Sequence, residues 1–317
     1  MSHGSNAALI DRIGNRDVIL SFSGGKDSTA AGLWLQEQGV PFRALFLDTG
    51  WEHRDTYAHI EKLEARFGPV IRVAANIEIP PDYLDEIADL ESRLGHPSPM
   101  VRRAVKYGMF PSRMRKWCTK ELKVLPFLLW CDAHPADVVN VVGIRRDESK
   151  ARATWPEWAD HPDAASVEVF APGILWTVQD VIDIHQRHGV EPCPLYLRGS
   201  SRVGCWPCIH SSRDDLLSFA FDAERVGILR DLEALVTRAA AHNHNHNLGE
   251  TRSFFQARIE EKGKPIRYPC WPIDKVLAWA QRVPNRRAWQ MDLFAAIPSE
   301  AGCARWGMCE HPSRKAG

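Results

Sequence analysis

The stretch Ser23-Gly24-Gly25-Lys26-Asp27-Ser28 lies between a short apolar run that starts at Asp17 and a helical pattern that ends before Gly39. Glycines let a backbone approach a ligand closely and turn its N–H groups inward. The N-terminus of the following helix favours an anion, and Lys26 adds a positive charge. Asp27 follows the lysine where the Walker loop has serine or threonine. The stretch therefore predicts a phosphate-binding loop of another kind, and a polar turn capped by Asp27 or Ser28 is the alternative.

Segments with strand and helix patterns alternate through the first two thirds of the chain. The pattern predicts further strands at 42–47, 70–74 and 137–143, and helices at 54–67, 177–188 and within 214–240. Such alternation is typical of an α/β fold, with a mostly parallel sheet and helices on both faces. Ligands of these sheets bind at the carboxyl ends of the strands. We expect an α/β domain over residues 1–200 and a helical, cysteine-bearing region over residues 201–317.

The composition excludes several classes of protein. Among 317 residues, 40 are Lys or Arg and 40 are Asp or Glu, so the formal net charge is zero. This balance argues against a general polyanion binder, although a local basic patch remains compatible with it. No apolar run approaches the ~18 residues of a membrane span. The polar N-terminus has no secretion-signal pattern, and we expect a cytoplasmic protein without membrane contact.

The cysteines form the second signal. Without a secretion signal a disulfide framework is not expected, and the spacing of Cys205 and Cys208 can present two thiolates to one metal. Thiolates suit both an iron–sulfur cluster and zinc, and a site without metal is the third alternative. The candidate metal ligands are Cys118, Cys205, Cys208, Cys303 and Cys309.

A local charge run surrounds Cys118. Residues 99–123 hold eight lysines and arginines, and Glu121 is their only acidic residue. The run predicts a surface for an anion, which would be pyrophosphate, sulfate or a nucleic-acid backbone. A solvated helix face is the alternative. We also expect the neighbouring cations to lower the pKa of the Cys118 thiol.

Several segments together resemble the PP-loop N-type ATP pyrophosphatases and the phosphoadenosine phosphosulfate (PAPS) reductase family. They also resemble the sulfurtransferases of DNA phosphorothioation and the adenylyl-sulfate reductases, and they span residues 18 to about 213. Beyond the glycine loop the matching segments are Phe46-Leu47-Asp48-Thr49-Gly50-Trp51-Glu52, residues 117–126, Gly143-Ile144-Arg145-Arg146-Asp147-Glu148-Ser149, Pro194-Leu195-Tyr196 and Gly204-Cys205-Trp206-Pro207-Cys208.

The resemblance implies a PP-loop fold that binds an adenine nucleotide. Mg²⁺ would bridge the phosphates, with help from Asp27. Lys26 and the N–H groups of the loop would stabilise the leaving pyrophosphate. The residues implied to bind the nucleotide are Ser23, Gly24, Gly25, Lys26, Asp27, Ser28, Asp48, Thr49, Gly50, Gly143, Arg145 and Arg146.

The resemblance also implies a sulfur reaction. The reductases of the family usually carry a degraded loop, whereas Lys26, Asp27 and Ser28 are all present here. This difference favours cleavage of ATP to AMP and pyrophosphate, which would activate an acceptor for thiolation. The acceptor would be tRNA, DNA or a small metabolite, and a cysteine desulfurase would be a suitable sulfur donor. Cys118 and the Cys205–Cys208 pair would hold or supply sulfur.

The cysteine segment departs from the adenylyl-sulfate reductases at one position. Trp117 stands where those enzymes have the first cysteine of a Cys-Cys pair, so one cluster ligand is absent. A [4Fe–4S] cluster would then have three protein ligands, or a fourth from Cys303 or Cys309.

Two other functions remain open. The first is a PAPS or adenylyl-sulfate reductase that takes adenylylated sulfate and forms sulfite. Cys309 would be its nucleophile and a thioredoxin-like protein its partner. The second is a non-catalytic module that senses a nucleotide or binds a nucleic acid.

Overall fold

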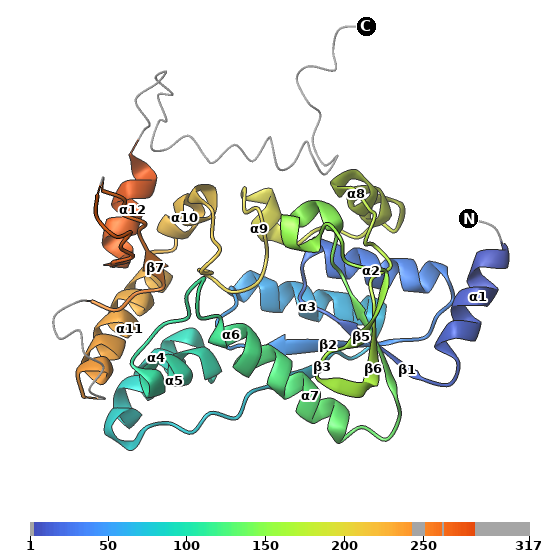
Figure 1. Cartoon of the computed structure of the whole chain (residues 1–317), viewed down its shortest axis with the longest axis horizontal. Coiled ribbons are helices and arrows are strands. Elements are labelled where there is room, and N and C mark those ends of the chain that lie inside the picture. The colour runs from blue at the N-terminus through green and yellow to red at the C-terminus, as the bar shows by residue number, and fades with distance from the viewer. Residues whose placement is uncertain (1–2, 243–250, 262, 283–317) are drawn as a thin grey trace, which may run out of the picture.

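A six-stranded sheet forms the centre of the protein in the computed structural model, which describes residues 3–242, 251–261 and 263–282 (Figure 1). The strand order is β3-β2-β1-β4-β6-β5, and every neighbouring pair is parallel except β5 with β6. The predicted α/β class and four of the strands are confirmed, whereas the β5–β6 hairpin was not predicted. The strands are β1 (Asp17–Ser21), β2 (Arg43–Asp48), β3 (Ile71–Ala74), β4 (Val138–Val142), β5 (Trp158–His161) and β6 (Ala164–Phe170).

Helices cover both faces of this sheet, as the sequence predicts. In β1, Leu20 packs with helices α2 (Lys26–Glu37), α3 (Arg54–Phe67) and α8 (Val178–Arg187), whereas Ile19 packs with α7 (Leu125–Asp132) on the other face. This division follows from the strand geometry, because successive side chains point to opposite faces.

Helices after residue 200 pack against helices that precede it. The predicted helical segment 214–240 contains two helices, α10 (Arg213–Ala220) and α11 (Ala223–His242), separated by residues 221–222. Helix α11 contacts α4 (Leu84–Leu94), α5 (Pro99–Tyr107) and α12 (Ile273–Gln281). One apolar cluster includes buried residues from Trp51 to Ala280. The domain division at residue 200 stays a prediction.

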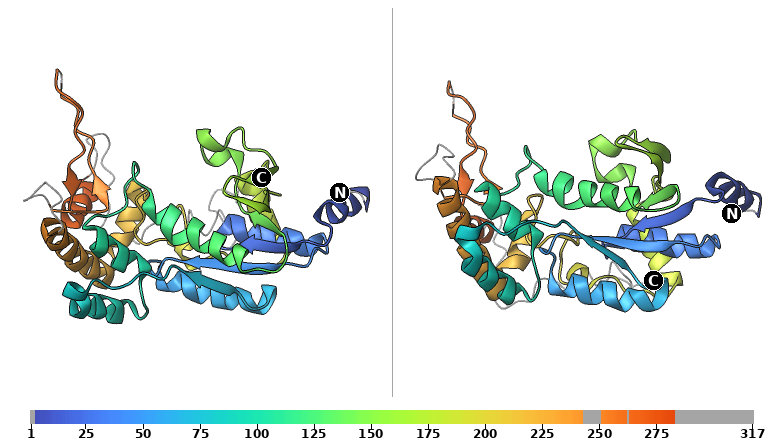
Figure 2. Two further views of the ribbon diagram at one scale, coloured as in Figure 1. Left: turned by 60° about the horizontal axis from the view of Figure 1, so that its bottom comes forward. Right: turned by 90° about the horizontal axis from the view of Figure 1, so that it is seen from below.

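Shorter elements connect these layers. Helix α1 (His3–Ile13) precedes β1, and α6 (Trp117–Thr119) continues into a π-helical turn at Lys120–Val124. Strands β7 (Phe255–Gln256) and β8 (Cys270–Trp271) pair as a short antiparallel ribbon, and the connection between them projects from the body in both views of Figure 2. The other short helices are 3₁₀ turns at Pro81–Tyr83, Arg146–Glu148 and Lys150–Arg152, and α9 (Pro194–Leu197).

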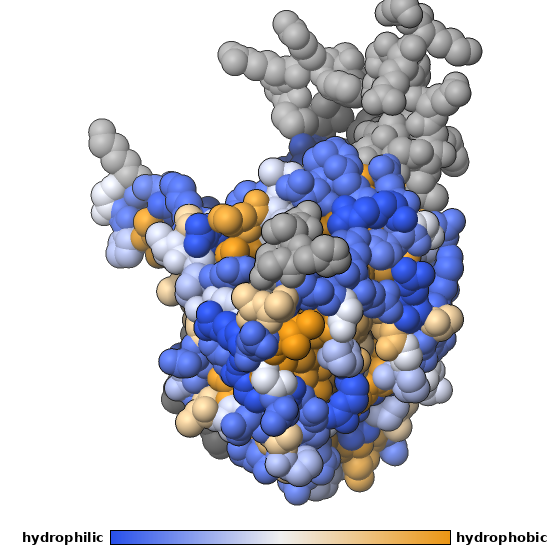
Figure 3. Space-filling model, turned by 90° about the vertical axis from the view of Figure 1, so that its right-hand side faces the viewer, coloured by the Kyte–Doolittle hydropathy of each residue, from blue (hydrophilic) through white to orange (hydrophobic). Residues whose placement is uncertain are grey.

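The surface is mostly polar on the face shown in Figure 3, where apolar side chains occupy small areas between hydrophilic ones. In the part of the chain that the structure describes, no helix has the length and apolar character needed to cross a membrane. The cytoplasmic location stays a prediction.

Gly143 allows the end of β4 to approach the first turn of α2. A Cβ atom at this position would lie 2.5 Å from the backbone nitrogen of Ser28. We expect Gly143→Ala to lower the free energy of unfolding by about 1–3 kcal/mol, because the two backbones must separate. Gly227→Ala is the matched control, since its Cβ would meet only Arg93 Nη2, at 3.5 Å. Urea unfolding curves check this, and equal midpoints for the two variants would show that the approach is not tight.

Glu233 connects helix α11 to the start of α12. Its buried carboxylate accepts a hydrogen bond of 3.0 Å from the backbone nitrogen of Ile273, and burial raises its pKa to about 7. Because the pKa of Glu233 in the folded state exceeds the ordinary glutamate value of 4.5, its contribution to stability is present below pH 4.5 and is lost as the pH rises through about 7.

We therefore expect Glu233→Gln to gain stability relative to wild type between pH 5 and pH 8, by at most ~3 kcal/mol. Urea unfolding at the two pH values measures the gain. Glu224→Gln, at an exposed position of the same helix, is the control. A wild-type minus variant difference that is the same at both pH values would contradict the assignment.

Candidate nucleotide and cysteine site

The predicted loop lies at the carboxyl end of β1 and leads directly into α2. Gly24 has φ +69°, in the left-handed region, and a Cβ atom there would lie 2.9 Å from Ile60 Cγ1. Gly25 caps α2 with an extended backbone, and its carbonyl oxygen accepts a hydrogen bond of 3.0 Å from the Ser28 hydroxyl. The same hydroxyl lies 3.2 Å from that of Ser23. The loop is therefore held by its own serines and glycines.

Asp27, in the first turn of α2, lies between two cations. Its Oδ2 is 3.1 Å from Lys26 Nζ, and its Oδ1 accepts a hydrogen bond of 2.6 Å from Arg145 Nε. The Arg145 side chain is 5% exposed and also contacts Asp147 at 2.6 Å. Arg145 thus lies beside the loop and pairs with two carboxylates, and its predicted role in nucleotide binding stays a prediction.

Arg146 does not join this group. Its Nε donates to the carbonyl oxygen of Trp155 at 3.0 Å. Arg145 precedes a 3₁₀ turn and Arg146 lies within it, so the two side chains have different partners. The expectation that both arginines meet one anion stays a prediction.

Two side chains from distant segments hold the backbone of Lys26. The nitrogen of Lys26 donates to the Tyr196 hydroxyl at 3.2 Å, and its carbonyl oxygen accepts from His185 Nε2 at 3.0 Å. Burial raises the pKa of Tyr196 and lowers that of His185, so both groups are held in their neutral forms. Tyr196 belongs to a quoted motif, whereas His185 was not singled out from the sequence.

The Asp48–Gly50 segment forms a tight turn at the end of β2. Asp48 Oδ1 accepts hydrogen bonds of 2.8 Å from both the Gly50 nitrogen and the Tyr57 hydroxyl. Gly50 has φ +64°, and a Cβ atom there would lie 2.5 Å from the Cα of Ser98. Thr49 is fully buried. These contacts shape the turn, and the predicted role of the segment at a ribose or adenine stays a prediction.

Glu52 connects this turn to the cysteine hairpin. Its carboxylate is 1% exposed and accepts from the Thr49 hydroxyl at 2.8 Å and from the Tyr57 hydroxyl at 3.2 Å. Cys205 Sγ lies 3.8 Å from Oε1 of the same carboxylate. Glu52 and Cys205 also pair as an isolated antiparallel bridge. Sequence reasoning missed the role of Glu52, although an acid directly after the Asp48–Trp51 stretch was visible in the quoted motif.

Arg225 closes the same junction from helix α11. Its guanidinium lies 4.2 Å from the ring centroid of Trp51 and donates to the carbonyl oxygens of Trp51 and Trp206 at 3.0 and 3.1 Å. Burial lowers its pKa to about 10. It is a structural cation, and nothing in the local sequence distinguished it from the other arginines of α11.

Cys118, Cys205 and Cys208 lie near one another and near Lys123. Burial raises the pKa of Cys118 and Cys208 adds to the rise, whereas the charge of Lys123 lowers it. The effect of burial outweighs that of the cation, so the expected net lowering of this pKa is wrong. Burial also raises the pKa of Cys205, to about 12. Lys123 is close enough for its charge to interact with Cys118, Cys205 and Cys208, which together with Glu52 raise its pKa.

The described residues do not supply a complete set of ligands for the predicted metal site. Among residues 3–242, 251–261 and 263–282, no group of three or more His, Cys, Asp or Glu side chains could hold a metal ion. Cys303 and Cys309 lie outside the described residues. Three thiols near one lysine have the right donor chemistry, but their arrangement does not form a site, so the cluster stays a prediction.

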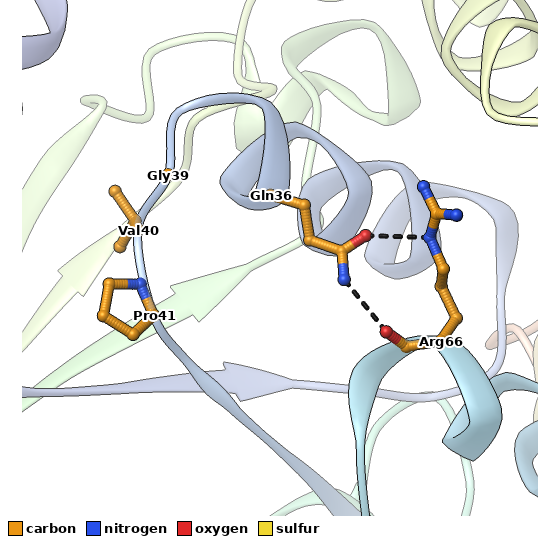
Figure 4. Close-up of a pocket in the computed structure, with 5 residues that line it drawn as sticks. All are labelled: Gln36, Gly39, Val40, Pro41 and Arg66. Atoms are coloured by element: carbon orange, nitrogen blue, oxygen red, sulfur yellow. Dashed lines mark hydrogen bonds between the residues drawn. The ribbon is translucent and has the colours of Figure 1, made fainter.

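A shallow pocket lies elsewhere, at the C-terminal end of α2 (Figure 4). Its lining includes Gln36 and Arg66, which exchange two hydrogen bonds of 2.9 and 3.0 Å. The pocket contains none of the predicted site residues, and its polar groups already bind each other.

Comparison with known proteins agrees with the loop and hairpin. The family model for the phosphoadenosine phosphosulfate reductase domain matches residues 17–211. An uncharacterized 37.8 kDa protein of Escherichia phage 186 is 32% identical over 92% of this chain and 96% of its own length. Adenosine 5′-phosphosulfate reductase 1 of Bacillus subtilis is 29% identical over 52% of this chain and 61% of its own length.

Among solved structures, the phosphoadenylyl-sulfate reductase of Candida auris aligns with 14% identity and a TM-score of 0.46, over 65% of this chain and 89% of that chain. This likeness is too weak to add to the argument. The sequence match over residues 17–211, which contains both the glycine loop and the cysteine hairpin, shows that the chain belongs to the phosphoadenosine phosphosulfate reductase domain family.

Proposed function

We propose that this protein binds ATP at residues 23–28, cleaves it to AMP and pyrophosphate, and so activates an acceptor for sulfur transfer. The observation that carries the proposal is the intact loop. Lys26 Nζ within the loop and Arg145 Nε after β4 both lie beside the Asp27 carboxylate. A reductase receives a substrate that is already adenylylated, and it has no need for this phosphate-binding group.

The chemistry assigned to the loop is electrostatic. The acceptor oxygen attacks the α-phosphorus of ATP, and the bond to the β-phosphate breaks. Lys26 and the N–H groups at the start of α2 stabilise the charge that develops on the leaving pyrophosphate. The Asp27 carboxylate suits Mg²⁺, which proteins bind through one or two carboxylates together with substrate phosphates. Bound Mg²⁺ would neutralise phosphate charge.

The transfer of sulfur is assigned to Cys118, Cys205 and Cys208. A sulfur nucleophile from an external donor, such as a cysteine desulfurase, displaces AMP from the activated acceptor. Cys205 supports this assignment, because Glu52 joins it to the turn that follows β2. A [4Fe–4S] cluster on Cys118, Cys205 and Cys208 is a further proposal, and zinc is the alternative.

A second candidate is an adenylyl-sulfate reductase. The Bacillus subtilis relative, named as adenosine 5′-phosphosulfate reductase 1, favours it. Its nucleophile would be Cys309 and its reducing partner a thioredoxin-like protein. The substrate separates the two candidates, because this activity releases sulfite from adenylyl sulfate without ATP.

We expect Lys26→Ala to reduce pyrophosphate release from ATP by about 10²–10³-fold, the usual cost of removing one group that stabilises transition-state charge. Lys62→Ala is the matched control, because Lys62 is 65% exposed on α3 and pairs only with Glu191 among the described residues. Pyrophosphate is measured with each acceptor class and with adenylyl sulfate in place of ATP. Equal release by the two variants, or sulfite formation without ATP, would contradict the proposal.

The metal proposal is tested separately. We expect anaerobically purified protein to contain about four irons and four labile sulfides, and Cys205→Ser to lose them. Cys131→Ser is the control, since Cys131 packs in the apolar cluster on the face of the sheet that α7 covers. Zinc without sulfide would replace the cluster by a structural site, and protein without iron or zinc would exclude both.

A further inference from the structure

A basic surface lies beside the cysteine hairpin. It consists of exposed side chains from two segments, the loop and turn at 109–120 and the hairpin at 202–210. The members of this basic surface are Arg113, Arg115, Lys116, Lys120, Arg202 and His210.

A hydrogen bond from a side chain to the backbone joins the two segments. Arg113 Nε donates to the carbonyl oxygen of Ile209 at 3.2 Å. The backbone nitrogen of Ser112 donates to the carbonyl oxygen of Arg115 at 3.0 Å, which closes a turn. Met114 at this turn is 87% exposed, so the turn projects from the body. The basic surface therefore has a defined shape.

Its cations come from both segments. Arg113, Arg115, Lys116 and Lys120 lie in the first segment and Arg202 in the second, and all five residues are exposed.

These cations differ from the first part of the charge run. Arg102 pairs with Glu91 at 2.6 Å, Arg103 with Glu121 at 3.0 Å and Lys106 with Glu78 at 3.7 Å. The run that the sequence treats as one unit thus has two parts, and the first is a paired helix face.

Within the described part of the chain, by contrast, the structure records no ion pair for the lysines and arginines of the basic surface. The side chains without one are Arg113, Arg115, Lys116, Lys120 and Arg202.

The exposure of the cations selects the kind of anion. A small anion binds well where several donors converge in a site shielded from water, whereas an exposed cation gains little from one contact. Several exposed cations along a projecting turn suit an anion that meets them all at once. A phosphate backbone does so, and each contact releases counterions.

The position of the basic surface relates it to the cysteines. The backbone nitrogen of His210 lies 3.5 Å from Cys208 Sγ, and Cys118 lies within the 109–120 segment. In both views of Figure 2 this segment and the β7–β8 ribbon rise on the same side of the molecule. A long polymer on that side would pass next to the thiols.

We propose that the basic surface binds the sugar–phosphate backbone of a nucleic acid and places it beside Cys118 and Cys208. The identification of this nucleic acid as the sulfur acceptor rests on the proposed function, whereas its binding does not. The shared chemistry is a phosphodiester chain, and the source is tRNA, duplex DNA or single-stranded DNA.

The test is fluorescence anisotropy with the full chain, without ATP, at several salt concentrations. The probes are a fluorescein-labelled tRNA transcript, a 20-base-pair DNA duplex and a 20-nucleotide DNA single strand. The duplex covers about two helical turns, and the single strand has the same number of nucleotides as one of its strands. The triple variant Arg115→Ala/Lys116→Ala/Lys120→Ala removes three cations of the basic surface. The triple control Lys62→Ala/Arg72→Ala/Arg187→Ala removes the same charge from α3, β3 and α8.

We expect the wild type and the control to bind at least one probe, and the variant to bind it at least ~10-fold more weakly. The slope of log affinity against log salt should fall by about two to three, because up to three phosphate contacts are lost. The preferred probe identifies the source. Equal affinity and slope for the variant and the wild type would overturn the proposal.

Failure to bind any of the three probes would also overturn the proposal, and would leave an acidic protein as the remaining partner for the basic surface. Lys26→Ala separates this inference from the proposed function. We expect it to retain nucleic-acid affinity while losing pyrophosphate release. Pyrophosphate release by a wild type that binds no nucleic acid would remove the further inference alone. Binding without pyrophosphate release would remove the proposed function alone.

Discussion

The buried carboxylate of Glu52 is the constraint on which the arrangement of the site depends. A carboxyl group with 1% exposure needs hydrogen-bond partners. Its partners are the Thr49 and Tyr57 hydroxyls and the backbone nitrogen of Trp51, at 2.8, 3.2 and 3.1 Å. Two of these donors lie in the turn after β2 and the third in the first turn of α3.

Glu52 also positions the cysteine hairpin. The backbone of Glu52 pairs with that of Cys205, and the Trp206 nitrogen donates to the carbonyl oxygen of Trp51 at 2.8 Å. Arg225 then bridges the Trp51 and Trp206 carbonyls from α11. The end of β2, the hairpin and the C-terminal helix thus share one polar junction. If Glu52 moved, it would leave several buried donors unsatisfied at once, which is costly.

The sequence was most informative where one segment decides its own structure. The glycine loop, four strands and helix α3 were predicted because alternation, periodicity and glycine placement are local signals. Helix α3 covers residues 54–67 in both the prediction and the structure. Strands β5 and β6 were missed, because β5 lies at the sheet edge with no buried residue and the first half of β6 has none either.

The candidate site was predicted less completely, since its contacts join residues far apart in the chain. Tyr196 and His185 reach Lys26 across 170 and 159 residues, and no pattern around either residue indicates this. The charge run shows the same limit. Its net charge was visible, but the division between paired and unpaired cations depends on where Glu78 and Glu91 fold. The effect of burial on Cys118 likewise depends on packing from other segments.

The large apolar cluster extends beyond the segment that matches the family model. The matching segment ends at residue 211, yet Phe219 and Leu229 lie beyond it and pack in the same cluster as Trp51 and Trp206. Their burial removes apolar surface of the matching segment from water. The segment that matches the family model is therefore smaller than the unit of packing. Exchange of this segment between relatives would require a compatible set of C-terminal helices, so the two parts are constrained to vary together.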